Sequence, residues 1–292
     1  MHAIRPTILV TGGAGYIGSH VVKELLERGY AVVVLDRRPL PAGLQSVEGA
    51  DRLTAIRGDL ADTATLDGIF RDSRPAAVMN FAGDISVGES VSNPAKYYRN
   101  NLANGLGLLD AMLAHGVMHF VFSSTAAVYG VPRSVPIPED HPTAPINPYG
   151  RTKLMIEQVL RDYDAAYGLR SVSLRYFNAA GADPSGLIGE DHQPETHLVP
   201  LVLQVPLGLR PHVEIFGTDY PTPDGTCIRD YIHVNDLARA HVLAVESLLD
   251  GGPGGIFNLG NGQGHTVRQV IATAEKVTGT SIRTVERPRR PG

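Results

Sequence analysis

Apolar residues along the 292-residue chain gather in short runs that alternate with stretches of helical periodicity. Each run is shorter than eight residues and ends in small or polar residues; the runs cover 7–10, 31–35, 53–56, 76–81, 119–122 and 171–175. Apolar positions recur at helical spacing between the runs, most clearly over 16–28, 94–114 and 148–167. This alternation predicts an α/β fold with a doubly wound parallel sheet covered by helices on both faces. Ligands bind such sheets beyond the carboxyl ends of the strands.

The pattern changes after about residue 180, where Pro and Gly become more frequent and the apolar runs shorten. Residues 181–194 are typical of a long loop. We therefore predict a first domain over 1–178, to which 229–250 returns. A smaller mixed α/β lobe is expected over 179–228 and 251–292, with the ligand in the cleft between the two.

The composition excludes several classes of protein. The net charge is −4, without the basic surplus of nucleic-acid-binding proteins. The single cysteine, Cys227, excludes an intrachain disulfide and a thiolate zinc cluster. No apolar run approaches the roughly 20 residues of a membrane-spanning helix, and the first run is too short for a signal peptide. We expect a cytoplasmic protein with no nucleic-acid partner, no membrane partner and no bound metal.

A glycine-rich loop follows the first apolar run and opens the first predicted helix. Gly12, Gly15 and Gly18 recur at three-residue spacing, with Tyr16 and Ile17 between the last two. Such a loop turns tightly, lets the backbone approach a pyrophosphate and faces it with a helix N-terminus. The loop therefore predicts a Rossmann-like dinucleotide site.

Acidic residues end the next two apolar runs. Asp36 lies 24 residues after Gly12, where a carboxylate accepts a hydrogen bond from a ribose 2′-hydroxyl and repels a 2′-phosphate, which favours NAD over NADP. Arg37 and Arg38 follow directly and weaken this preference, since either can pair with a phosphate. Asp59 is placed to meet the adenine side of the cofactor.

A tyrosine and a lysine lie four residues apart at the start of the helical stretch 148–167. Tyr149 and Lys153 share one helix face, and Pro148 suits the first turn. An ammonium and a positive nicotinamide ring both favour the phenolate, so Tyr149 is a candidate proton-transfer group. Polar residues end two apolar runs nearby, 123–125 and 175–178.

Taken with these motifs, the chain resembles the extended short-chain dehydrogenase/reductases, and among them the UDP-glucose (UDP-galactose) 4-epimerases. The matching segments span nearly the whole chain; they are 10–20, 87–90, 122–130, 148–154, 174–178, 219–222, 224–225 and 229–234. The last segment, with the sequence Arg-Asp-Tyr-Ile-His-Val, is much more specific than the glycine loop.

The resemblance implies a role for each matching residue. Tyr149 is the acid and base, Lys153 tunes it and binds the nicotinamide ribose, and Thr125 contacts the sugar 4-hydroxyl. The implied cofactor-binding residues are Gly12, Gly15, Tyr16, Ile17, Gly18, Asp36, Asp59, Leu60, Phe81, Ala82, Gly83, Asn100, Ser123, Tyr149, Lys153 and Tyr176. The implied substrate-binding residues are Ser124, Thr125, Tyr149, Asn178, His197, Leu198, Arg229, Tyr231 and Arg290.

The implied reaction oxidises the C4 alcohol of a UDP-sugar with NAD, turns the 4-keto sugar over and returns the hydride to its other face. The resemblance also implies a homodimer through helices near 94–114 and 148–167. Asp84 and Ile85 depart from the pattern, because some members carry a cofactor-contacting lysine there. The family pattern continues past residue 292 with segments that bind uridine and gate N-acetylated sugars, so a C-terminally truncated lobe with weakened UDP-sugar binding is expected.

Two alternatives stay open beside this interpretation, and the residues exclude a third. Sugar-nucleotide 4,6-dehydratases share the fold, but they need an acid and a base after the strand-end Thr, where this chain has Ala126 and Ala127. Epimerases for UDP-pentoses, UDP-uronates or UDP-N-acetylhexosamines need only modest changes of the pocket. A non-enzymatic dinucleotide sensor on the same fold would usually lack the Tyr149–Lys153 pair.

Overall fold

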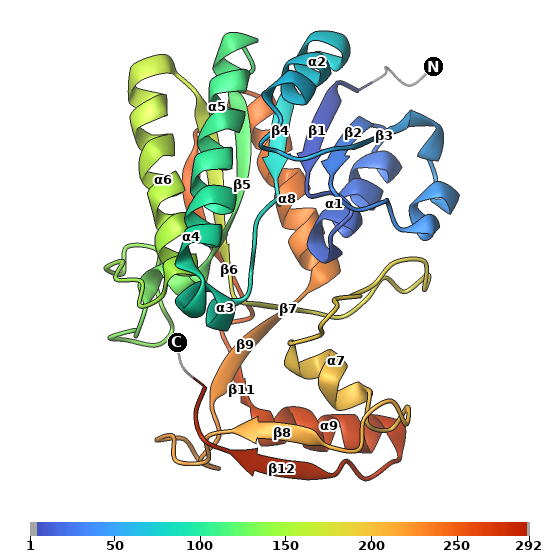
Figure 1. Ribbon diagram of the computed structural model, residues 1–292, viewed down its shortest axis with the longest axis vertical. Helices are drawn as coiled ribbons and strands as arrows, with labels where there is room; N and C mark the ends of the chain where they lie inside the picture. Colours follow the sequence, from blue (N-terminus) through green and yellow to red (C-terminus); the bar gives the residue numbers. More distant parts are fainter. Residues whose placement is uncertain (1–4, 291–292) are drawn as a thin grey trace.

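The computed structural model describes residues 5–290, in which a large α/β body lies above a smaller lobe (Figure 1). Seven parallel strands form the central sheet in the order β10-β6-β5-β4-β1-β2-β3. Their bounds are β1 Thr7–Thr11, β2 Ala31–Asp36, β3 Leu53–Arg57, β4 Ala77–Asn80, β5 His119–Thr125, β6 Arg170–Tyr176 and β10 Gly255–Leu259. The order reverses between β1 and β4, which opens a crevice at the carboxyl ends there.

Helices cover both faces of the sheet. On one face, α1 (Tyr16–Glu27) and α8 (Val234–Leu249) bury apolar side chains with β1 and β2 in a first core. On the other face, α2 (Thr63–Ser73), α5 (Asn104–Ala114) and α6 (Pro148–Tyr167) form a second core. The predicted doubly wound α/β fold is confirmed, with strands that are buried on both faces.

The predicted helix over 94–114 is interrupted. A short helix α4 (Pro94–Tyr97) leads into a π-helical segment (Tyr98–Ala103) before α5 begins. A π-helical turn widens the helix locally and commonly lies at a functional site. Apolar periodicity does not reveal it, because the pattern on either side is still helical.

The smaller lobe is built around two small sheets. In one, β9 (Ile228–His233) pairs with β7 (Asn178–Ala180) and β11 (Gly264–Thr266); in the other, β8 (Val213–Phe216) pairs with β12 (Thr284–Arg287). The helices α7 (Leu198–Leu203) and α9 (Val267–Thr278) pack against the second sheet in a third core. The remaining helical segments are α3 (Val87–Ser92) and 3-10 turns at Ala42–Ser46, Ala50–Arg52 and Ala126–Tyr129.

Two predicted boundaries need correction. The range 251–292 was expected in the second lobe, but β10 pairs in parallel with β6 and extends the large sheet. The return expected over 229–250 begins only at α8, because β9 belongs to the small sheet. No helix within residues 5–290 is both long enough and apolar enough to span a membrane.

Candidate active site

A large cavity runs along the carboxyl ends of β1, β4, β5 and β6 and continues into the smaller lobe. Its volume is about 1920 Å³, which exceeds the roughly 300–1,000 Å³ typical of a pocket for one drug-sized ligand. Most of the predicted site residues line it, from Gly12 in the first domain to Arg290 in the second lobe. The cavity therefore has room for a dinucleotide and a second ligand.

The glycine loop packs too closely to accept side chains. Gly12 has a φ of +77°, and a Cβ there would lie 2.5 Å from the Ala82 nitrogen. A Cβ on Gly18 would lie 2.3 Å from the Gly12 carbonyl oxygen. Gly15 precedes the first turn of α1 and offers no side-chain cap, so the N–H groups of Tyr16, Ile17 and Gly18 face an anion site. This cradle fits the pyrophosphate of a dinucleotide.

Two backbone N–H groups hold the carboxylate at the end of β2. Asp36 Oδ2 accepts from Ala14 N at 3.0 Å, and Oδ1 accepts from Arg38 N at 2.9 Å. Each oxygen keeps a second lone pair for a ribose hydroxyl. The Arg38 guanidinium also lies close to Gly15, and Asp59 lies 3.7 Å from Arg37. The two arginines thus frame the cofactor end of the cavity.

The proposed proton-transfer group, Tyr149, lies in the first turn of α6. Asn147 caps this helix by accepting from Gly150 N, and Pro148 occupies the first helical position. The Tyr149 side chain is buried at the cavity wall, and burial raises its pKa. Hydrogen bonding with Thr125 opposes this rise in the pKa of Tyr149.

Lys153 lies one turn further along α6 and is buried behind the wall. Its Nζ donates to the Ser123 carbonyl oxygen at 2.8 Å and lies 5.9 Å from the centre of the Tyr149 ring. Burial lowers the pKa of Lys153 to about 8. Ser123 Oγ in turn shares a hydrogen bond of 2.6 Å with the Tyr176 hydroxyl. These contacts fix the end of β5 beside Tyr149.

Ser124 does not reach the cavity, and its expected substrate contact is wrong. Its hydroxyl donates to Glu157 Oε1 of α6 at 2.5 Å, in a fully buried position on the face of the sheet that α6 covers. Glu157 also forms a buried ion pair with Arg175 at 2.5 Å. The physical reason is the alternation of side chains along a strand, because Ser123 and Thr125 face the cavity and Ser124 faces away.

Asn100 lines the cavity from the π-helical segment, but its amide already has a partner. Its Nδ2 donates to Asp84 Oδ2 at 2.6 Å, and Lys96 Nζ lies 3.3 Å from the same carboxylate. The neighbouring Asn101 accepts from Asp84 N at 2.8 Å. Asp84 thus stands where some relatives of the family carry a cofactor-contacting lysine, and it is neutralised by Lys96.

The predicted substrate residues border the cavity in the smaller lobe. Asn178 Nδ2 donates to the Asp230 carbonyl oxygen at 2.8 Å, which orients the amide at the start of β7. Burial raises the pKa of Tyr231 to about 12, so its hydroxyl stays a donor at neutral pH. The Arg290 guanidinium stacks on the Phe216 ring at 3.9 Å. The side chains with cationic or donor groups that line this part of the cavity are Asn178, His197, Arg229, Tyr231 and Arg290.

The cluster of titratable residues that precedes α7 was not identified from the sequence. Glu190, His192 and Glu195 lie in the loop before α7 and line the cavity beside His197. A hydrogen bond with Glu190 raises the pKa of His197, the residue that directly precedes α7. The alternation of acids and histidines over 190–197 was a signal that could have identified them.

Comparisons with known proteins agree with this geometry. The family described as the NAD dependent epimerase/dehydratase family matches residues 8–260. The UDP-glucose 4-epimerase of Azospirillum brasilense is 54% identical over 296 residues, covering 99% of this chain and 82% of that protein. The UDP-glucose 4-epimerase of Halalkalibacterium halodurans is 55% identical and covers 98% and 84%.

Solved structures show the same architecture. The UDP-glucose 4-epimerase from Brucella ovis in complex with NAD superposes with a TM-score of 0.90 at 48% identity, covering 99% of this chain and 87% of that one. The enzyme from Bifidobacterium longum in complex with NAD⁺ and UDP gives a TM-score of 0.91 at 44% identity, covering 98% and 87%.

Proposed function

This chain belongs to the NAD dependent epimerase/dehydratase family, and from that membership and the site we propose how its residues perform the reaction. The chain is a UDP-glucose 4-epimerase that inverts C4 of a UDP-sugar with NAD as cofactor. The observation that carries the assignment is the placement of Tyr149 and Thr125 at one wall of a cavity that begins at an uncapped helix N-terminus.

We assign the cofactor to the glycine-loop end of the cavity. The backbone of 16–18 would bind its pyrophosphate, and Asp36 would accept a hydrogen bond from a ribose hydroxyl. The residues at the ends of β4 and β5 would lie beside its nicotinamide ring. The chemistry that NAD supplies when bound is a hydride acceptor, and afterwards a hydride donor, at the sugar C4. Because the hydride returns in every turnover, the chain needs no added cofactor once NAD is bound.

We assign proton transfer to Tyr149. It takes the proton of the C4 hydroxyl as that carbon is oxidised and gives it back when the carbonyl is reduced on its other face. Thr125 lies within hydrogen-bonding reach of Tyr149 and is positioned to hold the same hydroxyl. Lys153 supports the phenolate through its positive charge, and it fixes the end of β5 through Ser123.

The 4-keto sugar must turn over without leaving the cavity. The UDP part stays bound through residues remote from C4, so its binding energy retains the intermediate. We assign this role to Asn178, Arg229, Tyr231 and Arg290 at the second-lobe end. The dehydratase alternative is not favoured, because Ala126 and Ala127 line the cavity next to Thr125 and carry no acid or base.

The experiment that tests this function needs only the purified chain. Heat denaturation should release NAD, and the native chain should convert UDP-galactose to UDP-glucose without added NAD. Release of NAD without turnover of any UDP-sugar would instead support the sensor alternative.

We also propose that the chain forms a homodimer through α5 and α6, which lie side by side on the outer face of the sheet (Figure 1). Leu109, Met112 and Leu160 of these helices are buried in the core, but Leu106 and Val159 are only half-buried. Sedimentation should show a dimer that Leu106→Glu disrupts. The matched change Leu243→Glu, at an exposed position of α8, should leave it intact.

A cytoplasmic location is the last part of the proposal. The single cysteine, Cys227, is half-buried against the third core and forms no disulfide, which suits a reducing compartment. Fractionation of the source cells should place the chain in the cytoplasmic fraction.

A further inference from the structure

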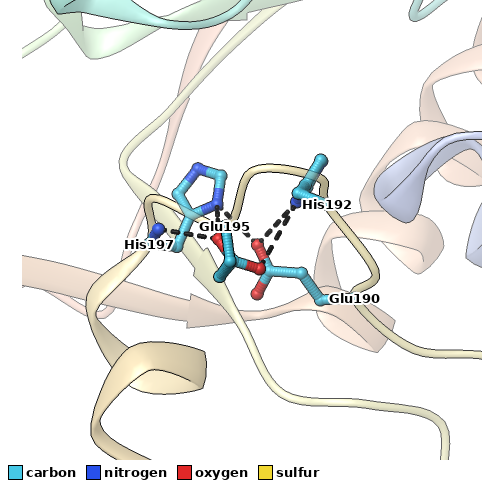
Figure 2. Close-up of side chains that lie close together, drawn as sticks. All are labelled: Glu190, His192, Glu195 and His197. Atoms are coloured by element: carbon cyan, nitrogen blue, oxygen red, sulfur yellow. Dashed lines mark hydrogen bonds and ion pairs between the residues drawn. The ribbon is translucent and has the colours of Figure 1, made fainter. Parts of the chain in front are cut away.

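Two glutamates and two histidines converge from one loop at the edge of the cavity (Figure 2). Glu190, His192, Glu195 and His197 alternate along eight residues between β7 and α7. All four border the cavity, and the mechanism above uses none of them except His197 as a substrate contact. Their ligand atoms all lie within 4.8 Å of one another.

The distances between these atoms suit one metal ion. A tetrahedral Zn²⁺ site with bonds of about 2.0–2.2 Å separates its ligand atoms by roughly 3.3–3.6 Å. His192 Nδ1 lies 3.2 Å from Glu190 Oε1 and 3.8 Å from Glu195 Oε2, while His197 Nδ1 lies 3.2 Å from Glu195 Oε1. The 2.6 Å pair of His197 Nδ1 and Glu190 Oε1 must open to admit the ion.

The two carboxylates of the cluster are buried, so a cation bound between them would balance their charge. The side chains of Glu190 and Glu195 are 6% and 9% exposed. Among residues 5–290, no lysine or arginine lies within ion-pair distance of either carboxylate, and the two imidazoles are their only charge partners. A divalent ion balances two buried carboxylates while leaving both imidazoles neutral, as metal ligation requires.

Surrounding contacts hold the ligands in place. Glu195 Oε1 accepts from the backbone nitrogens of Thr196 and His197 at 2.6 and 2.7 Å, which orients its carboxylate. The Tyr16 ring meets His192 edge-on at 6.3 Å, and its hydroxyl donates to the Gly181 carbonyl oxygen at 2.5 Å. Such outer contacts orient the ligands of metal sites. They also join the loop to the first turn of α1.

We propose that Glu190, His192, Glu195 and His197 form a four-coordinate site for Zn²⁺ or a similar divalent transition metal. Four protein ligands close the coordination sphere, as in structural zinc sites, and leave no open position for catalysis. The ion fastens the loop 181–197 against α1 and so forms a wall of the cavity. Ligation through Nδ1 leaves His197 Nε2 available to a ligand in the cavity. This site follows from the loop's own geometry and does not rest on the proposed epimerisation.

The test uses the full chain without a histidine tag, stripped by a chelator and then titrated with Zn²⁺. Elemental analysis after dialysis should find one zinc per chain, and Co²⁺ in its place should show the visible absorption of a tetrahedral ion. His192→Ala and Glu195→Gln should each weaken zinc affinity at least roughly tenfold. His265→Gln, at an exposed histidine outside the cluster, should bind zinc like the unmodified chain.

Three outcomes would overturn the proposal. They are less than one zinc per two chains after dialysis, an octahedral Co²⁺ spectrum, or equal zinc affinity in His192→Ala and His265→Gln. Retained NAD content and circular dichroism show whether each variant is folded. Because the unmodified chain alone gives the stoichiometry and the spectrum, a variant that fails to fold does not remove the test.

Discussion

Lys153 Nζ donates a hydrogen bond to the Ser123 carbonyl oxygen and lies 5.9 Å from the centre of the Tyr149 ring. Both side chains are buried, and burial moves both pKa values toward the neutral forms, up for Tyr149 and down for Lys153. The free protein thus holds a protonated tyrosine beside a lysine that is charged below about pH 8. The remaining positive charge that favours the phenolate has to arrive with the cofactor.

Replacing the tyrosine tests its role in proton transfer. Tyr149→Phe removes only the hydroxyl, so the chain should keep its fold and its NAD while kcat falls about 10²–10⁴-fold. The coupled assay for UDP-glucose gives kcat, and heat release gives NAD content. Tyr167→Phe, at the exposed end of the same helix, should leave both unchanged. A Tyr149→Phe chain with normal kcat would assign the proton to another group.

His241 of α8 should make stability depend on pH. Burial lowers its pKa to about 4, against 6.5 in the unfolded chain. Between these values the unfolded state binds more protons, so the stabilisation is complete above about pH 6.5 and is lost as the pH falls toward 4. The shift in the pKa of His241 corresponds to a loss of about 3 kcal/mol.

Urea unfolding at several pH values measures this loss. His241→Leu should unfold with a weaker pH dependence than the unmodified chain between pH 6.5 and 4. His265→Gln changes an exposed histidine and should keep the full dependence. If the free energy of unfolding changed equally with pH in His241→Leu and in the unmodified chain, the His241 imidazole would not be the source of the pH dependence.

The buried pair of Glu157 and Arg175 should be costly to break. Glu157→Gln leaves the Arg175 guanidinium buried without its counter-charge, which should lower the free energy of unfolding by about 3–5 kcal/mol. Glu27→Gln breaks the more exposed pair with Lys23 and should cost less than about 1 kcal/mol. Denaturant titration measures both variants. Similar losses would mean that the Glu157 pair adds nothing through its burial.

The glycine loop should tolerate no methyl group. The Cβ of Gly18→Ala would lie 2.3 Å from the Gly12 carbonyl oxygen, so the loop must shift and NAD content should fall at least tenfold, corresponding to about 1.4 kcal/mol. The Cβ of Gly107→Ala in α5 meets no atom within 4 Å, and this change should leave NAD content intact. Full NAD occupancy in Gly18→Ala would place the cofactor elsewhere.

Local patterns predicted the parts of the site that lie at strand and helix ends. The glycine loop, the strand ends at 123–125 and the Tyr149–Lys153 pair follow from apolar runs and short spacings. The side-chain direction of Ser124 was also predictable, because residues alternate along a strand. The matching family pattern assigned it to the substrate, and the geometry overrides that assignment.

Other features depend on contacts that no local pattern records. The strand β10 follows a Gly- and Pro-containing turn, and its place beside β6 is set by pairing with residues more than 70 positions earlier in the sequence. The π-helical turn at 98–103 lies within a stretch whose apolar residues have ordinary helical spacing, so that spacing does not reveal it. The side chains of Glu190, His192, Glu195 and His197 come together because of the path of their loop. The spacing of apolar residues does not predict that path.

The most direct test of the central claim is conversion of UDP-galactose in deuterium oxide by the purified chain, without added NAD. Because the hydride removed from C4 is the one returned, the UDP-glucose formed should carry hydrogen and no deuterium at C4, as read by nuclear magnetic resonance. No conversion, or deuterium at C4, would contradict the account.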